Sequence, residues 1–275
     1  MYDVMHDASG ALRAPWRIVV FVSIAVLLAM VAGSVLSAGG EEGTAVALAA
    51  AVLAAHWAIF RLGGRGSWQS VGLGRDAVRP ALLTEGTLIG AIAIAAPTLA
   101  LVVVGWFSFQ TSDPGSSLVA ALRLALLLLP AALWEELFFR GYVFSTIRES
   151  WGAPAALVLT SLAFGLLHLA NAGANLQAIT QVTLAGVWLG AVLLATRSLY
   201  AAWAAHFAWN WTLAALLHAP VSGIPFPVPD YRLIDTGPGW ATGGVWGPEA
   251  GLFALAGMVL TMIYLFTRRT RRGER

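Results

Sequence analysis

Two adjacent glutamates and an arginine stand inside one of the most apolar parts of the chain, "LPAALWEELFFRGYVF" at 129–144. Glu136 and Arg140 are four residues apart with the acid first, which places them on one helix face as an ion pair. Glu135 is rotated by about 100° from Glu136 on a helix, so it has no such partner within its own helix. Because apolar surroundings disfavour a carboxylate, the unpaired Glu135 is a candidate proton acceptor.

Two further pairs with a spacing of four residues follow this segment, and we call them polar pairs because each contains a histidine. Phe164 and His168 share one helix face, and so do His206 and Asn210. The second pair forms a polar edge that presents two hydrogen-bond donors to the interior of a bundle. We expect Asn171, about one turn beyond His168, to fix the tautomer of that imidazole.

The residue types in these pairs favour hydrolysis by an activated water molecule. The chain has no cysteine, and no serine or threonine near these pairs stands out as a nucleophile. Glu135, aided by His168, would take a proton from water. His206 and Asn210 would then stabilise the oxyanion that forms on an attacked carbonyl.

A zinc site is the alternative chemistry for the same residues. Glu135, His168 and His206 could supply two imidazoles and one carboxylate, with an open position for water. The tandem His-Glu-x-x-His motif of many zinc proteases is absent from the sequence. We favour a site without a required cofactor, since Arg140 neutralises Glu136 and His206 is needed as a donor.

The elements that position these residues are predicted to be membrane helices. Of the 275 residues, 59% are hydrophobic and 11% are charged, and the mean hydropathy is +0.76. Runs long enough to cross a bilayer, about 18 residues, recur along the sequence. The predicted fold is an all-α polytopic membrane protein, one membrane domain over 1–275, with about eight transmembrane helices at 17–38, 44–62, 81–107, 118–146, 153–171, 175–196, 199–218 and 250–267.

The first predicted span could instead be a signal peptide, with "SVLSAGG" as its cleavage site. Its apolar run is longer than a typical signal core, so we interpret it as a span.

The polar groups of three predicted spans lie at similar depths. At the helical rise per residue, Glu135 lies about 20 Å from Arg148, and His168 lies about 21 Å from Pro154. By the same measure His206 lies about 14 Å, and Asn210 about 20 Å, from Arg197. We therefore expect the polar groups of these spans to converge. Other ionisable residues near span ends are interpreted as structural, namely His56, Glu85, Arg123 and His218.

The arginines gather on one set of connections, and there is no lysine. Loops 38–43, 108–117 and 171–175 contain no arginine, and 219–249 contains only Arg232. The arginine-bearing set comprises Arg13, Arg17, Arg61, Arg65, Arg75, Arg79, Arg148, Arg197 and the five arginines of 268–275. The positive-inside rule places this set, and both termini, in the cytoplasm. The basic tail is interpreted as a contact with the lipid bilayer, not with nucleic acid.

The ordered combination Glu135-Glu136-x-x-x-Arg140, Phe164-x-x-x-His168 and His206-x-x-x-Asn210 resembles the CPBP family of intramembrane proteases. This family comprises CAAX proteases and bacteriocin-processing enzymes, also called Abi. The resemblance covers a core at about 118–218. It implies that Glu135 is the catalytic glutamate, that His168 shares the water, and that His206 and Asn210 form the oxyanion site, with Glu136 and Arg140 in support.

The resemblance also implies an endopeptidase that acts near the cytoplasmic side on a membrane-associated protein or peptide. In eukaryotic members of the family the substrate is a prenylated protein, which loses its last three residues. The all-arginine, alanine-rich composition is typical of a bacterial protein, so we expect an inner-membrane location. Because prenylation is not expected there, a literal CAAX substrate is not predicted. The family is described both as metalloprotease-like and as metal-independent.

Three other functions use the same polar groups. A transporter could use the acids as proton or cation ligands, although the paired broken helices of such proteins are not evident. An inactive relative could bind a peptide and confer immunity. A buried polar network could also serve only to specify helix packing.

Overall fold

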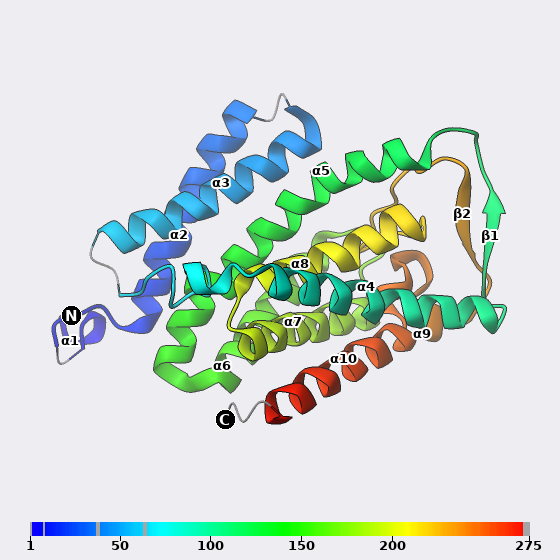
Figure 1. Ribbon diagram of the computed structural model, residues 1–275. Coiled ribbons are helices and arrows are strands. Elements are labelled where there is room, and N and C mark those ends of the chain that lie inside the picture. Colours follow the sequence, from blue (N-terminus) through cyan, green and yellow to red (C-terminus); the bar gives the residue numbers. More distant parts are fainter. Residues whose placement is uncertain (1, 8, 37–38, 63–64, 272–275) are drawn as a thin grey trace.

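The computed structural model describes residues 2–7, 9–36, 39–62 and 65–271, and helices dominate them (Figure 1). Positions 37 and 38 of the first predicted span, and Arg272 and Arg275 of the tail, lie outside this described part. The long helical elements are α2 (Ala14–Leu36), α3 (Gly40–Arg61), α4 (Pro80–Val103), α5 (Ser117–Glu136), η3 (Leu137–Tyr142), α6 (Val143–Leu167), α7 (Leu176–Thr196), α8 (Leu199–Trp211), η5 (Thr212–Leu216) and α10 (Leu252–Arg271). Short elements are α1 (Tyr2–Met5), η2 (Arg75–Ala77), η4 (His168–Ala170), α9 (Gly239–Thr242), η6 (Gly244–Trp246), η7 (Pro248–Ala250) and the strands β1 (Phe107–Thr111) and β2 (Tyr231–Asp235).

Within the described residues, five helical segments are long and apolar enough to cross a membrane. They are Ala14–Ser34, Gly40–Arg61, Pro80–Val103, Ser117–Ala170 and Leu176–Thr196. This supports a polytopic helical membrane protein, whereas the predicted count of eight spans is not confirmed. The predicted spans 118–146 and 153–171 fall within one segment, and the helices at the other two, α8 and the apolar part of α10, are shorter.

The segment Ser117–Ala170 is not a straight rod, because two glycines interrupt it. Gly152 has φ +87°, a left-handed conformation that glycine adopts without steric cost. Gly141, inside the π-helical η3, has non-helical angles of φ −79° and ψ −121°. The chain therefore bends between α5 and α6, and α6 itself is broken near its start.

Three helices around the site, α5, α7 and α8, begin at side-chain caps. Ser116 accepts a hydrogen bond from the Val119 N–H at 3.3 Å, before α5. Asn175 does the same for α7, and Ser198 for α8. These caps satisfy N–H groups that have no partner within the helix, so the starts of these helices are fixed locally.

The long connection 219–249 contains regular structure. β2 pairs antiparallel with β1, in the register Phe107↔Asp235 to Thr111↔Tyr231. Asp230 joins this loop to the start of α5, accepting hydrogen bonds from the N–H groups of Gly115 and Ser117 at 3.1 Å each and from the Ser117 hydroxyl. The hydroxyl bond contributes most to lowering the pKa of Asp230, followed by the two N–H bonds.

The bundle has two chemically different ends (Figure 1). α1 and the last described turn of α10 lie at one end, together with the connection between α3 and α4. β1 and β2 lie at the opposite end. We call these the arginine-rich and the arginine-poor end, because the first carries the connection 61–79 with four arginines and the second carries the loops with almost none.

Candidate active site

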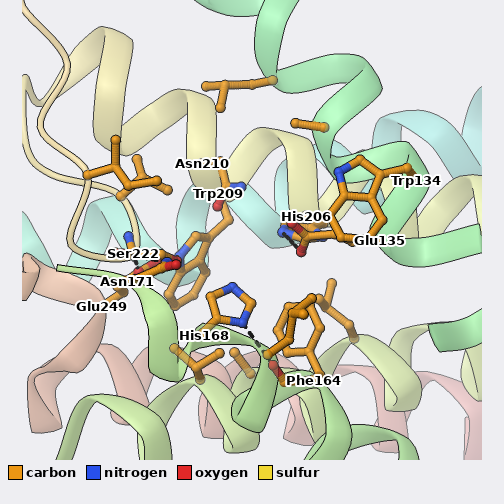
Figure 2. A pocket seen from close by; sticks show the side chains of 18 of the residues that line it. Trp134, Glu135, Phe164, His168, Asn171, His206, Trp209, Asn210, Ser222 and Glu249 are labelled. Atoms are coloured by element: carbon orange, nitrogen blue, oxygen red, sulfur yellow. Dashed lines mark hydrogen bonds and ion pairs between the residues drawn. The ribbon is translucent and has the colours of Figure 1, made fainter. Parts of the chain in front are cut away.

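A cavity of about 480 Å³ lies between the helices and the loop 219–249, and it contains every residue predicted to be catalytic (Figure 2). Glu135 comes from α5, His168 from η4, and His206 and Asn210 from α8. The predicted convergence of these spans is therefore present in the structure. The other lining residues are mostly apolar and include Leu127, Leu128, Ala131, Trp134, Phe164, Val182, Leu189 and Trp209.

The helix that carries the two acids changes from α to π geometry directly after them. In η3 the Tyr142 N–H donates to His56 Nε2 at 3.0 Å, while His56 Nδ1 contacts the Val52 carbonyl at 2.8 Å. A Cβ atom added to Gly141 would collide with the His56 ring. His56 thus provides an acceptor where the helix is distorted, and it fixes the rotation of the segment that bears Arg140.

The predicted ion pair of Glu136 and Arg140 is confirmed. Arg140 Nη1 lies 3.1 Å from Glu136 Oε1, and both side chains are fully buried. Arg140 Nη2 also donates to the Gly186 carbonyl of α7 at 3.2 Å, and the guanidinium lies 4.3 Å from the centre of the Phe164 ring. The arginine therefore links η3 to α6 and α7. Phe164, which shares a helix face with His168, forms a cation–π contact with the Arg140 guanidinium.

His206 is held between the two acids. Its Nδ1 lies 2.9 Å from Glu136 Oε1, and its Nε2 lies 3.8 Å from Glu135 Oε2. Glu136 thus serves two partners, not Arg140 alone. When Nδ1 donates to Glu136, Nε2 carries a proton only if the ring is doubly protonated.

The predicted contact between Asn171 and His168 is wrong. Asn171 Nδ2 donates instead to the Ser222 carbonyl at 2.9 Å. His168 Nδ1 contacts the Phe164 carbonyl, one helical turn earlier, at 2.8 Å. Since a carbonyl only accepts, Nδ1 carries the proton and Nε2 of the neutral ring is left as an acceptor. The backbone carbonyl of Phe164 therefore fixes the tautomer of His168, the role that was predicted for Asn171.

Glu135 has unused hydrogen-bonding capacity toward the cavity. Its side chain is 18% exposed, whereas that of Glu136 is fully buried. Its buried Oε2 has no hydrogen-bond partner within the described part of the chain. The prediction that one acid is held and the other is available describes this geometry, with the addition that His206 lies beside the available one.

The sequence interpretation missed two acids of the cavity, the exposed Glu41 in α3 and the buried Glu249 in η7. The Glu249 carboxylate accepts hydrogen bonds from the indoles of Trp209 and Trp246 at 3.0 Å each and from the Ser222 N–H. Glu249 follows a loop rich in proline and glycine, and no helical spacing links it to the other polar residues. Its place in the cavity depends on the fold of that loop.

The residues interpreted as structural have partners outside the catalytic group. Glu85 pairs with Arg268, and the His218 ring stacks on Tyr231 with 3.7 Å between the ring centres. His56 is completely buried, and its Nε2 accepts a hydrogen bond from the Tyr142 N–H of η3. Arg123 is exposed on α5.

The three residues predicted as alternative metal ligands are not grouped as a metal site in the described part of the structure. Among the described residues, no three His, Asp or Glu side chains are grouped so that they could hold a metal ion.

The fold and the cavity define a helical membrane protein with a buried glutamate and histidine centre. Residues 117–212 match the family model described as type II CAAX prenyl endopeptidase Rce1-like. The resemblance to the CPBP and CAAX proteases is thereby confirmed, and it indicates a protease kind of activity. The match begins at α5 and ends in η5, so it includes all three polar pairs. Comparison with curated proteins and with solved structures gave no match.

The cavity lies toward the arginine-poor end of the bundle. Residues from its connections line the cavity, whereas no described residue of the arginine-bearing connections does; these lining residues are Glu41, Asn171, Val221, Ser222, Ile224, Phe226 and Glu249. Cytoplasmic termini and activity near the cytoplasmic side were both expected. In this structure the cavity lies away from α1 and the last described turn of α10, which are at the arginine-rich end (Figure 1).

Proposed function

We propose that the chain is an intramembrane endopeptidase that hydrolyses a peptide bond in a membrane-associated protein or peptide. The observation that supports this most strongly is the convergence of Glu135, His168, His206 and Asn210 on one cavity. All four lie within the segment that matches the endopeptidase family model. The apolar lining suits a hydrophobic peptide segment, and the volume is in the range of about 300–1,000 Å³ typical of ligand sites.

The proposed reaction begins with water held between Glu135 and His168. The Glu135 carboxylate accepts a proton while the water oxygen attacks the carbonyl carbon of the peptide bond. His168 Nε2 accepts a hydrogen bond from the same water, because its Nδ1 proton is committed to the Phe164 carbonyl. The C–N bond then breaks as the proton passes from Glu135 to the leaving nitrogen, which regenerates the carboxylate.

The oxyanion of the intermediate is stabilised from α8. The Asn210 amide donates directly, and His206 Nε2 donates when the ring is doubly protonated. Glu136 then accepts the Nδ1 proton of His206 and holds the ring in place. The Glu136–Arg140 pair thus positions a catalytic histidine without contacting the substrate.

Glu135→Gln tests this function in the purified protein and in cells. General base catalysis contributes about 100- to 10,000-fold, so we expect cleavage to fall by at least about 100-fold, with unchanged thermal unfolding. Glu41→Gln, an exposed acid at the rim of the same cavity, is the matched control and should retain activity.

Since the substrate is unidentified, membrane-protein termini are compared in cells with wild-type protein, with the Glu135→Gln variant, or with none. New termini that require Glu135 identify the substrate. Termini that persist with Glu135→Gln would refute the assigned base. Activity that vanishes after chelation and returns with one zinc ion per chain would replace the metal-free mechanism.

We also propose that the arginine-poor end faces away from the cytoplasm, so that substrate enters from that side. The positive-inside rule supports this orientation. The chain has no cysteine, so single cysteines report the sidedness of the membrane cleanly. In spheroplasts, a membrane-impermeant maleimide should label Gln110→Cys in β1 and leave Ser150→Cys unlabelled until lysis, since both positions are exposed. The reverse pattern would place the cavity on the cytoplasmic side.

A further inference from the structure

Glu249 is a buried acid whose partners are all electrically neutral. It is 8% exposed and accepts from Trp209 Nε1 at Oε2, and from Trp246 Nε1 and the Ser222 N–H at Oε1. Two indoles and one amide supply hydrogen bonds but no positive charge. No ion pair of Glu249 is recorded in the part of the chain that the structure describes.

A purely structural latch between the loop and α8 would not need this charge. Any carbonyl oxygen could accept the same N–H groups, and burying an anion without a cation is unfavourable. A carboxylate has about four acceptor positions, of which these donors use three. The remaining position is on Oε2, and Glu249 lines the cavity.

The charge of the cavity is negative as a whole. Its lining includes the carboxylates of Glu41, Glu135 and Glu249 and no arginine. The nearby buried arginine, Arg140, is committed to Glu136 and to the Gly186 carbonyl. A substrate that ends in a free carboxylate at this site would meet only like charge, whereas a cation would find an unpaired acid.

We propose that Glu249 selects substrates with a cationic Lys or Arg side chain for the peptidase site proposed above. Figure 2 shows Glu249, Ser222 and Asn171 on one side of His168, and Glu135 and His206 on the other. The cation therefore binds beside the scissile bond and not at the attacking water. This inference rests on the proposed function for its biological meaning, but the preference for charge is measurable without cleavage.

The test measures binding in the Glu135→Gln variant, where hydrolysis is disabled. The probes are short fluorescent alanine and leucine peptides, acetylated and amidated at their ends, with a single central Lys, Gln or Glu. We expect the Lys peptide to bind at least about tenfold more tightly than the Gln peptide, and the Glu peptide most weakly. Adding Glu249→Gln should remove the difference between the Lys and Gln peptides.

Trp246→Phe is the matched control, because it removes one hydrogen bond to Glu249 and keeps the charge. The preference for Lys should persist in this variant. Loss of the preference to the same degree as with Glu249→Gln would show that only the loop contact matters, and this would overturn the proposal. Equal binding of the three peptides, or binding of none, would also overturn it. A failed cleavage test with Glu135→Gln would leave this outcome unaffected.

Discussion

Two buried glutamates near the cavity, Glu136 and Glu249, are held in opposite ways. Glu136 is enclosed by charge, with the guanidinium of Arg140 and the imidazole of His206 against one oxygen. Glu249 is enclosed by neutral indole and amide donors. The first comes from an apolar helix and the second from the end of a loop that covers the arginine-poor end.

The difference assigns Glu136 to the support of the catalytic residues and Glu249 to the recognition of substrate. A carboxylate whose charge is compensated inside the protein is electrically satisfied, so it is suited to hold other groups in place. A carboxylate that is solvated only by neutral donors keeps its charge available to a ligand in the cavity. The first cluster is Glu136 with Arg140 and His206, and the second is Glu249 with its indole and amide donors. We expect substitutions at the first cluster to damage the fold and the catalytic geometry. Substitutions at the second cluster should change substrate preference.

The largest effect is expected from Arg140→Leu. This change leaves Glu136 buried without its cation and removes the contacts of Arg140 with Gly186 and Phe164. Breaking a buried pair by removing one partner costs about 3–5 kcal/mol. Thermal or denaturant unfolding in lipid nanodiscs measures the loss, and cleavage should be abolished with it.

The double variant Glu136→Gln with Arg140→Leu is the control for this effect. Because it removes the orphaned charge along with its partner, it should unfold less easily than Arg140→Leu alone. Cleavage should stay low in both, since His206 loses the Glu136 carboxylate in the double variant. Equal stability of the single and double variants would mean that Glu136 does not depend on charge compensation.

A smaller effect is expected from His56→Leu. His56 is not a member of the first cluster but contacts η3, the segment that carries Arg140. The Tyr142 N–H loses its acceptor, and a buried unsatisfied donor costs about 1–3 kcal/mol. The altered rotation of η3 should lower kcat for cleavage. The preference between Lys and Glu peptides should not change, because His56 does not contact the Glu249 cluster. A changed preference between Lys and Glu peptides with a normal kcat would contradict the assignment of the first cluster to catalysis and the second to recognition.

The sequence predicts contacts within one helix better than contacts between helices or with a loop. The pair Glu136–Arg140 and the shared face of Phe164 and His168 depend on spacing within one helix, so they could be predicted. The approach of His206 to Glu136 could be expected only as a convergence of helices at one depth. Which oxygen the imidazole contacts depends on helix rotation, which the π-helical η3 changes, and the sequence does not reveal that distortion.

The fold was predictable where apolar runs are long, and less so where glycine interrupts them. The runs of α2, α3, α4 and α7 predict membrane helices directly, whereas the predicted spans 118–146 and 153–171 lie in one helical segment that is kinked at Gly152. The strands β1 and β2, and the entry of Glu249 into the cavity, depend on contacts between residues far apart in the sequence. No local pattern in a loop rich in proline and glycine predicts such contacts.

The smallest effect is expected where the loop that precedes Glu249 is fastened, at Asp230. Hydrogen bonds from the Ser117 hydroxyl and two N–H groups lower the pKa of Asp230 below its usual value of 3.8. A carboxyl with a lowered pKa in the folded protein stabilises the fold at pH values above its usual pKa. This contribution is lost as the pH falls through the lowered folded value. The stabilisation is therefore complete at neutral pH and disappears in strong acid.

Asp230→Asn isolates this contribution, because asparagine keeps an acceptor oxygen but not the charge. Wild-type protein should be slightly more stable than the variant at neutral pH, and the difference should shrink below about pH 4 as Asp230 takes up a proton. Asp7, whose pKa is also lowered, is the same in both proteins and cancels in the difference. Lys and Glu peptides should be distinguished less well by Asp230→Asn if the loop must be fastened to hold Glu249 in the cavity. A stability difference that is constant with pH would show that the charge of Asp230 does not fasten the loop.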